Sequence, residues 1–373
     1  MSLPPFALER WFARWEFVAP HLLGTSDVEA WRLADLLALA DPDARARWDA
    51  LTLGYTEPAG LPALREAIAG LYADVAADEV LVTTGAEEAI YVLLRSLLAP
   101  GEHCVVTWPA YQSLHAVARA AGADVTLLPL RAEQGWVPTP EQLAAALRPA
   151  TRLVVLNFPH NPTGALPDAA TFRRLVEVAR AQGAYVLSDE VYRLLEHDPA
   201  DRLPAGVELP GRTISLGVMS KAFGLAGLRI GWLATHDREV LARVAGYKDY
   251  TTICASAPSE VLALAALRAR EAVLARSRAI VAANLPLLDA FFERWAGVVE
   301  WVRPRAGCIG YPRLLLPTPV ERFCEELVER EGVLLLPGTV FGDERNHFRI
   351  GFGRRTVAAG LEGLGRFLAR ATR

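Results

Sequence analysis

The stretch LVVLN at residues 153–157 decides the fold, because an apolar run of this length is typical of a strand buried on both faces of a sheet. An amphipathic pattern at residues 169–181 predicts a helix, and a second apolar strand follows at residues 184–188. Parallel strands need a crossover connection, which a helix of this length supplies. The three segments therefore predict one strand–helix–strand unit of a mostly parallel sheet.

The same alternation continues outward in both directions. Further strands are expected at residues 79–84, 103–107, 124–128, 212–216 and 229–234. Further helices are expected at residues 61–75, 87–98, 111–121 and 141–147. Seven strands alternating with helices predict an α/β fold, in which a large domain holds a mostly parallel seven-stranded sheet covered by helices.

The pattern changes after Pro258. Residues 259–292 form one long helical pattern, and short strands alternate with helices from there to the C-terminus. This texture predicts a smaller α+β domain. We expect residues 1–45 to form an N-terminal arm and part of the small domain, residues 46–265 the large domain, and residues 266–373 the small domain.

Composition excludes several classes of protein. The chain has 373 residues, 52% hydrophobic and 22% charged, as in a well-packed globular protein. A net charge of −4 argues against a nucleic-acid partner. We see no apolar run long enough to span a bilayer and no cysteine spacing typical of a metal site. Four scattered cysteines predict reduced thiols in a cytoplasmic protein.

Lysine is rare in this sequence. Lys221 and Lys248 are the only two lysines, whereas 37 arginines make up the rest of the 39 basic residues. An amine can lose its proton and attack a carbonyl, and a guanidinium effectively never does. Lys221 lies in the glycine-rich segment SKAFGLAGLR at residues 220–229. We interpret it as a nucleophile that forms a Schiff base, in preference to a surface lysine in a turn.

Other chemically active side chains fall where predicted strands end, the edge at which doubly wound sheets bind ligands. The turn at Gly85 opens a helix and offers backbone N–H groups to a phosphate. Tyr111 can place an aromatic face over a planar ring. Asn161 lies in a rigid bend of two asparagines and two prolines. Asp189 needs a buried cation such as a protonated pyridine nitrogen, and Arg229 suits a phosphate.

Together these residues resemble the class I/II aminotransferases, which are fold-type I pyridoxal-phosphate enzymes. The resemblance runs from Leu53 to the C-terminus and rests on NPTG at 161–164, DEVY at 189–192, and SK at 220–221 with Arg229. It implies pyridoxal 5'-phosphate as cofactor and transfer of an amino group between an amino acid and a 2-oxo acid. It also implies a homodimer with shared active sites.

The resemblance assigns roles around the cofactor ring. Lys221 would form the Schiff base and then act as a general base beside the substrate Cα. Asp189 would pair with the pyridinium nitrogen. Asn161 and Tyr192 would hydrogen-bond the ring hydroxyl oxygen, and Tyr111 would stack on the ring.

The resemblance also assigns the phosphate and the substrate. The phosphate would be held by Gly85, Ala86, Glu87, Ser220 and Arg229, and by Tyr55 from the partner subunit. Relatives often carry Ser or Thr where this chain has Glu87, so we expect its N–H to contribute while its side chain points away. Arg349, with Asn161 nearby, would bind the substrate α-carboxylate.

A second reaction class stays open. The segments GTSDVE at 24–29, PRAG at 304–307 and GYPR at 310–313 look like a subgroup that includes capreomycidine-synthase-like enzymes. Members of that subgroup use the same cofactor for elimination and cyclisation on an arginine derivative. A lyase, cyclase or decarboxylase on this fold is therefore the alternative to a transaminase.

The last expectation concerns the side chain of the substrate. Thr252 falls about where dicarboxylate-specific relatives carry a second arginine. Its presence there argues against aspartate or glutamate as the specific amino donor. Four aromatic residues are candidates for a side-chain pocket, Trp15, Phe17, Tyr250 and Tyr311. They predict a neutral, apolar or aromatic amino acid. The aromatic N-terminal stretch is also expected to pack on the partner subunit.

Overall fold

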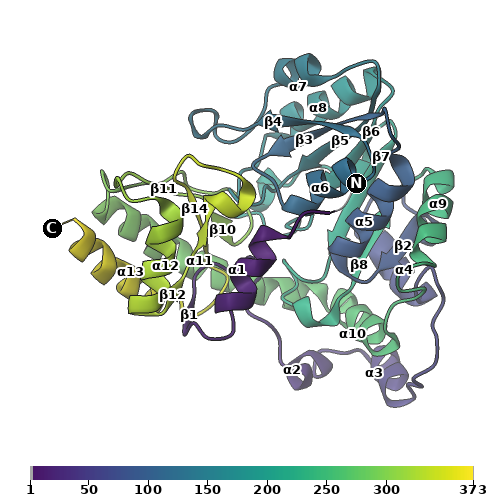
Figure 1. Ribbon diagram of the computed structural model, residues 1–373. Helices are drawn as coiled ribbons and strands as arrows, with labels where there is room; N and C mark the ends of the chain where they lie inside the picture. The colour runs from purple at the N-terminus through teal and green to yellow at the C-terminus, as the bar shows by residue number, and fades with distance from the viewer. Residues whose placement is uncertain (1–2, 373) are drawn as a thin grey trace.

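A seven-stranded sheet forms the centre of the protein (Figure 1). The computed structural model describes residues 3–372. The strands follow the order β2-β8-β7-β6-β5-β3-β4. Their bounds are β2 (Val80–Thr83), β3 (His103–Trp108), β4 (Asp124–Pro129), β5 (Thr151–Asn157), β6 (Tyr185–Asp189), β7 (Thr213–Val218) and β8 (Gly231–Ala234). All neighbours are parallel except β8, which is antiparallel to β2 and β7. The predicted fold class is confirmed.

Helices cover both faces of this sheet. On one face lie α5 (Gly85–Leu97), α6 (Gln112–Ala120) and α9 (Arg238–Lys248), packed on alternate strand residues such as Leu153 and Val155. On the other lie α7 (Pro140–Ala146) and α8 (Ala169–Ala181), packed on Val154 and Leu156. Because side chains alternate along a strand, the fully apolar β5 supplies both hydrophobic layers.

The register of β5 and β6 places two polar strand ends together. Asn157 is paired directly with Asp189, the last residue of each strand. Both lie at the carboxyl edge of the parallel strands, where a doubly wound sheet binds ligands. The loops that leave this edge carry the functional side chains described below.

The C-terminal part is built from small sheets and helices. Its helices are α11 (Arg270–Arg294), α12 (Val320–Glu331) and α13 (Val357–Ala371), whereas the preceding α10 (Ala257–Arg268) packs on helices from the first 70 residues. Its strands are β9 (Val299–Glu300), β10 (Ile309–Gly310), β11 (Arg313–Leu314), β12 (Val333–Leu334), β13 (Leu336–Pro337) and β14 (Phe348–Gly351). The N-terminal β1 (His21–Leu22) pairs with β12, so the start of the chain joins this part. Three further helices are α2 (Leu33–Leu37), α3 (Pro42–Asp49) and α4 (Pro62–Ala69).

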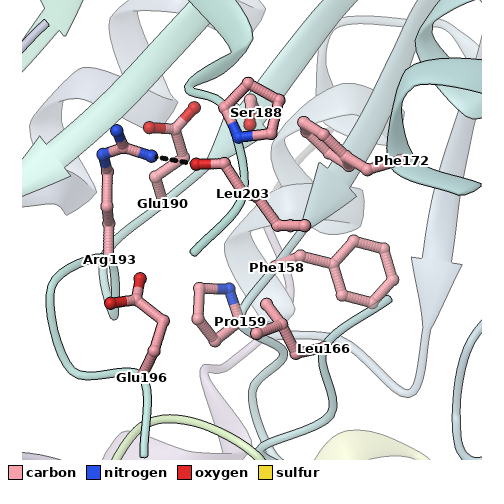
Figure 2. Close-up of a pocket in the computed structure, with 10 residues that line it drawn as sticks. Phe158, Pro159, Leu166, Phe172, Ser188, Glu190, Arg193, Glu196 and Leu203 are labelled. Atoms are coloured by element: carbon pink, nitrogen blue, oxygen red, sulfur yellow. Dashed lines mark hydrogen bonds between the residues drawn. The ribbon is translucent and has the colours of Figure 1, made fainter. Parts of the chain in front are cut away.

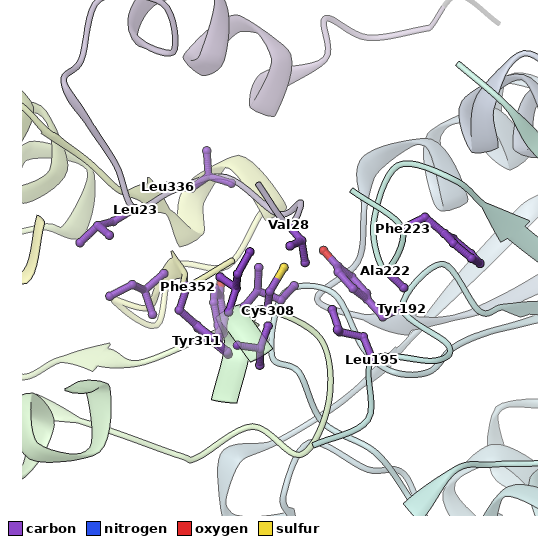
Figure 3. Close-up of a cluster of buried hydrophobic side chains, with 14 of the residues drawn as sticks. Leu23, Val28, Tyr192, Leu195, Ala222, Phe223, Cys308, Tyr311, Leu336 and Phe352 are labelled. Carbon is purple, nitrogen blue, oxygen red and sulfur yellow. The ribbon is translucent and has the colours of Figure 1, made fainter. Parts of the chain in front are cut away.

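A continuous apolar cluster connects the C-terminal part to the large sheet (Figure 3). Leu336 and Tyr311 belong to the C-terminal side, and Phe223 belongs to the loop after β7. Val28 and Cys308 are buried between them. This cluster lies beneath the segment at residues 24–27, which therefore rests on a packed surface.

One expectation about helices was wrong. The pattern at 259–292 is two helices, because α10 ends at Arg268 and α11 begins at Arg270. The break is at Ala269, whose ψ of 20° leaves the helical region.

The N-terminal aromatic stretch is helix α1 (Ala7–Trp15), and it packs on its own chain. Leu8, Trp11 and Phe12 are buried, and Trp11 Nε1 donates to the Leu335 carbonyl at 3.0 Å. Figure 1 shows α1 lying between the C-terminal part and the sheet. Among residues 3–372, no helix has the length and apolar character needed to cross a membrane.

Candidate active site

A cavity of about 390 Å³ lies at the carboxyl edge of the large sheet. It is lined by nine of the residues that the sequence singled out: Ala86, Glu87, Tyr111, Asn161, Asp189, Ser220, Lys221, Arg229 and Arg349. These residues come from six separate segments of the chain. The fold therefore brings the predicted site together in one place.

Lys221 follows β7 and faces this cavity. Its Nζ donates a hydrogen bond to Ser26 Oγ at 2.8 Å. Burial lowers the pKa of the Lys221 amine, and the nearby carboxylate of Asp27 acts in the opposite direction. A lowered pKa favours the neutral amine, the form that attacks a carbonyl.

Asp189 ends β6 and is only 4% exposed. Its carboxylate accepts a hydrogen bond from the Val191 N–H at 3.3 Å. Burial raises the pKa of Asp189 to about 7, and the neighbouring Glu190 adds to the rise. A buried carboxylate with so few donors is suited to a cationic partner from a ligand, such as a protonated ring nitrogen.

A second, much smaller cavity lies beside Glu190 and Arg193 (Figure 2). Its volume of about 10 Å³ is too small for a cofactor. Glu190 Oε1 accepts from the Gly206 N–H at 2.6 Å and from Ser215 Oγ at 2.8 Å. These bonds hold the end of β6 from the side opposite the ligand cavity.

The opposite end of the site is shaped for an anion. Gly85 opens α5 with a φ of +78°, and a Cβ built there would lie 2.7 Å from Arg229 Nη2. Arg229 itself has a φ of +54° and donates to the Ala226 carbonyl at 3.2 Å. The guanidinium thus occupies space that only a glycine leaves open, next to the free N–H groups of a helix N-terminus.

Glu87 corrects one expectation. Its side chain lines the cavity instead of pointing away, and it accepts a hydrogen bond from Ser113 Oγ at 3.0 Å. Burial raises the pKa of Glu87 to about 7. Burial thus shifts the Glu87 equilibrium towards the neutral carboxyl, which does not repel a phosphate.

Arg349 and Asn161 form a pair on the far side of the cavity. Arg349 Nη1 donates to Asn161 Oδ1 at 3.1 Å, while Nε and Nη2 donate to the Gly24 carbonyl at 3.3 and 2.8 Å. A guanidinium has five N–H groups, so one on each terminal nitrogen remains. Arg349 is held in place and still has two donors for a carboxylate.

Tyr111 and Tyr192, the two tyrosines expected at the cofactor ring, differ in their positions relative to the cavity. Tyr111 lines the cavity, and its ring packs at 5.1 Å from that of Phe6. Tyr192 is fully buried, and its hydroxyl donates to the Ser26 carbonyl at 2.7 Å. Figure 3 shows this hydroxyl directed towards Val28 and Cys308. In this structure the Tyr192 donor is thus engaged by the chain itself.

The predicted aromatic side-chain pocket does not form within the described chain. Phe17 and Tyr250 are 91% and 92% exposed, and Tyr311 stacks on His347 at 4.9 Å. Thr252 Oγ1 donates to Glu88 outside the cavity. Tyr55 is 91% exposed and lies apart from the cavity of its own chain.

Sequence reasoning gave no role to five polar residues of the cavity: Glu9, Glu16, Thr25, Ser26 and Asp27. Glu9 and Glu16 are seven residues apart, two turns of a helix, and this spacing signals a shared face. Ser26 and Asp27 follow β1 in a segment without regular structure. The segment GTSDVE at 24–29 signalled a resemblance but not a place in the cavity, because that place depends on pairing between β1 and β12.

Within residues 3–372, no group of three or more histidine, cysteine, aspartate or glutamate side chains is arranged to hold a metal ion. The cavity instead combines an amine, a buried carboxylate and an anion cradle. This combination defines a pyridoxal-phosphate enzyme of fold type I. The chain belongs to the aminotransferase class I and II family, whose family model it matches over residues 28–362.

The individual relatives include a transaminase as well as a synthase and a cyclase. The chain is 34% identical to capreomycidine synthase of Streptomyces vinaceus, covering 98% of this chain and 95% of that protein. It is 32% identical to arginine–pyruvate transaminase AruH of Pseudomonas aeruginosa, covering 91% and 90%. It superimposes on the structure of the pyridoxal-phosphate-dependent cyclase OrfR with a TM-score of 0.90 and 34% identity, covering 99% and 98%.

The family implies pyridoxal 5'-phosphate as the cofactor, and the residues present fit this molecule. The cradle at Gly85 and Arg229 suits the phosphate. Asp189 suits a ring nitrogen that carries a proton, and Lys221 suits the aldehyde carbon.

Proposed function

We propose that this protein is an aminotransferase that uses an amino acid with a cationic side chain as amino donor and a 2-oxo acid as acceptor. The observation that carries the cationic preference is the composition of the cavity wall. Three carboxylates, Glu9, Glu16 and Asp27, line the same cavity as Lys221 and Arg349. The proposal replaces the expectation of an aromatic pocket.

The roles of the chain's own residues follow from their positions. Pyridoxal phosphate, when bound, supplies the electron sink that makes a proton leave the substrate Cα. Arg349 binds the substrate α-carboxylate with its two remaining N–H groups, and Asn161 keeps the guanidinium oriented. Lys221 accepts the Cα proton on its neutral amine. Asp189 keeps the ring nitrogen protonated.

Of the three carboxylates in this wall, Asp27 has an arginine partner among the described residues. Burial raises the pKa of Glu16, and the charges of Asp27 and Glu9 raise it further. The charges of Arg354 and Lys221 offset part of this rise. Arg354 Nη2 pairs with Asp27 at 3.2 Å, and Tyr111 donates to Glu9 at 3.3 Å. A guanidinium or ammonium group of a substrate would relieve the repulsion between these carboxylates.

The name of arginine–pyruvate transaminase AruH supports this choice of substrate. Capreomycidine synthase and the cyclase OrfR support the second candidate, a lyase or cyclase that starts from the same bound amino acid. Both candidates need the same contacts to the α-carboxylate and the cationic end. They differ in whether the amino group of the donor is transferred to a 2-oxo acid acceptor.

A substrate panel tests the proposal. The protein loaded with cofactor is incubated with pyruvate or 2-oxoglutarate and with arginine, lysine, leucine, phenylalanine or aspartate, and new amino acid and 2-oxo acid are measured. We expect kcat/KM to be highest for arginine or lysine. A higher kcat/KM for leucine, phenylalanine or aspartate would contradict the cationic preference. Consumption of the donor without a new 2-oxo acid would support the second candidate.

Matched variants distinguish the contacts to the substrate side chain from the contacts to its α-carboxylate. Glu16→Gln should lower kcat/KM about tenfold for cationic donors, roughly 1.4 kcal/mol, and leave neutral donors nearly unchanged. Arg349→Ala should weaken every amino acid by roughly 2–5 kcal/mol. Glu321→Gln, on an exposed part of α12, serves as control.

A further inference from the structure

Ser26 is a polar residue of the cavity whose partner is the reactive lysine. Its Oγ accepts the hydrogen bond from Lys221 Nζ at 2.8 Å across 195 residues of sequence. Ser26 lies in the segment between β1 and α2, and Lys221 lies after β7. The contact therefore depends on the docking of the N-terminal segment against the large sheet.

The backbone carbonyl of Ser26 is held by two buried side chains. Its carbonyl accepts from the Tyr192 hydroxyl at 2.7 Å and from Cys308 Sγ at 3.6 Å. Both donors are fully buried in the cluster of Figure 3. These two hydrogen bonds hold the Ser26 backbone at its carbonyl.

The neighbours of Ser26 are fixed as well. Arg354 donates to Thr25 Oγ1 at 3.1 Å and to both carboxylate oxygens of Asp27 at 3.2 Å. The Gly351 N–H donates to the Leu23 carbonyl at 2.6 Å, and a side chain at Gly351 would collide with the backbone of Thr25. The segment is thus clamped onto β14 and presents the serine oxygen at a defined place.

We propose that Ser26 is a positioning residue for Lys221, holding Nζ beside the substrate Cα whenever the amine is not bound to the cofactor. This inference rests on the proposed function. A hydroxyl suits the task because it accepts from an ammonium and donates to a neutral amine. When Lys221 takes the Cα proton, the substrate C–H bond breaks and the lone pair of the amine forms the new N–H bond on Nζ. The electron pair left on Cα would be withdrawn by bound pyridoxal phosphate, and Ser26 Oγ accepts a hydrogen bond from the resulting ammonium.

The inference makes a prediction about protonation. A hydrogen bond to a charged group is stronger than one to its neutral form, so the bond to Ser26 stabilises the ammonium more than the amine. Ser26→Ala should therefore lower the pKa of the free Lys221 amine by about one unit. The charged and titratable groups that face this amine stay the same in the variant: Glu16, Asp27, Asp189, Tyr192, Cys308 and Arg349.

The experiment uses protein loaded with pyridoxamine 5'-phosphate, which has no aldehyde and leaves Lys221 free. The rate of amidination of Lys221 is measured from pH 6 to 11 by peptide mass spectrometry. Lys248, which donates to the Pro58 and Ile253 carbonyls, is the internal reference. Ser26→Ala should shift the Lys221 profile to lower pH, and Ser26→Thr, which keeps the hydroxyl, should restore it.

Turnover is measured on the same proteins. Ser26→Ala should lower kcat about tenfold with KM nearly unchanged, because the substrate contacts at Arg349 remain. Ser96→Ala, whose hydroxyl donates to Leu93 in α5, is the control and should match the wild type. An unchanged Lys221 pKa in Ser26→Ala would overturn the inference, whether or not kcat falls. Failure of the proposed aminotransferase reaction would instead appear in the wild-type protein, so the two failures are distinguishable.

Discussion

At the scale of single residues, Gly85 links backbone conformation to cofactor binding. Gly85→Ala places a Cβ 2.7 Å from Arg229 Nη2 at a φ of +78°. We expect the guanidinium to move and the Kd for pyridoxal phosphate to rise at least tenfold, about 1.4 kcal/mol. Gly101→Ala is the matched control, since its φ is +89° and its Cβ would meet nothing within 4 Å. Titration of cofactor absorbance measures both; equal Kd values in the two variants would argue against the cradle.

Asp189 gives a second prediction at this scale, through pH. The cofactor-free folded protein holds the Asp189 proton more tightly than the unfolded chain, since burial raises its pKa from 3.8 to about 7. This contribution to stability is complete below pH 4 and is lost as pH rises to about 7. Relative to Asp189→Asn, the wild-type free energy of unfolding should therefore fall by more than about 1 kcal/mol over this range. Parallel curves from urea denaturation would contradict it.

Single residues also show which parts of the site could be predicted from the sequence. Lys221, Asp189 and Arg229 could be predicted, because each is an unusual residue type at the end of an apolar strand or in a glycine-rich turn. Ser26 could not, because its place depends on a parallel pair between β1 and β12 more than 300 residues apart. The orientation of Glu87 was missed because its partner, Ser113, lies on another helix.

At the scale of elements, helix α1 spans the cavity from one side to the other. Its start is tied to α6, where the Ala7 N–H donates to Gln112 Oε1 at 2.9 Å. Trp11 and Arg14 are tied to the C-terminal part, the latter through Glu325 at 2.8 Å. Because Glu9 and Glu16 lie at its ends, α1 carries much of the proposed specificity.

Trp11→Ala tests this element. Loss of a buried tryptophan costs about 3–5 kcal/mol, and we expect that cost to appear as undocking of α1. Hydrogen exchange in residues 4–16 should accelerate, and KM for cationic donors should rise. Arg10→Ala, at an exposed position of the same helix, should change neither. Unchanged exchange in Trp11→Ala would show that α1 is held by other contacts.

Elements were predicted well where the pattern was local. All seven strands of the large sheet could be predicted, since each contains a short apolar run. The break between α10 and α11 could not, because Ala269 lies between two arginines without a glycine or proline to mark it. Conversely, Pro286 lies inside α11 without ending it.

At the scale of the whole molecule, an exposed apolar patch predicts a homodimer. Leu53 and Tyr55 are 86% and 91% exposed, and Tyr250 is 92% exposed. Lys248 Nζ joins their loops by donating to the Pro58 and Ile253 carbonyls at 2.7 and 2.8 Å. Such a patch is typical of an interface, and the family resemblance places Tyr55 at the phosphate of the partner subunit.

Leu53→Asp combined with Tyr250→Asp should shift the protein to a monomer and reduce turnover, since the sites are expected to be shared. Light scattering after size exclusion measures the mass. Leu315→Asp, at a residue 44% exposed in the C-terminal part, is the control and should remain dimeric. A wild-type protein that is a fully active monomer would contradict the prediction.

The four cysteines differ in exposure, and this difference allows dimer assembly to be followed by labelling. Cys104, Cys308 and Cys324 are buried, whereas Cys254 is partly exposed, one residue after Ile253 in the loop that carries the apolar patch. A maleimide fluorophore should therefore react first at Cys254 without any engineered thiol. Its emission would report in real time when a second subunit covers the loop.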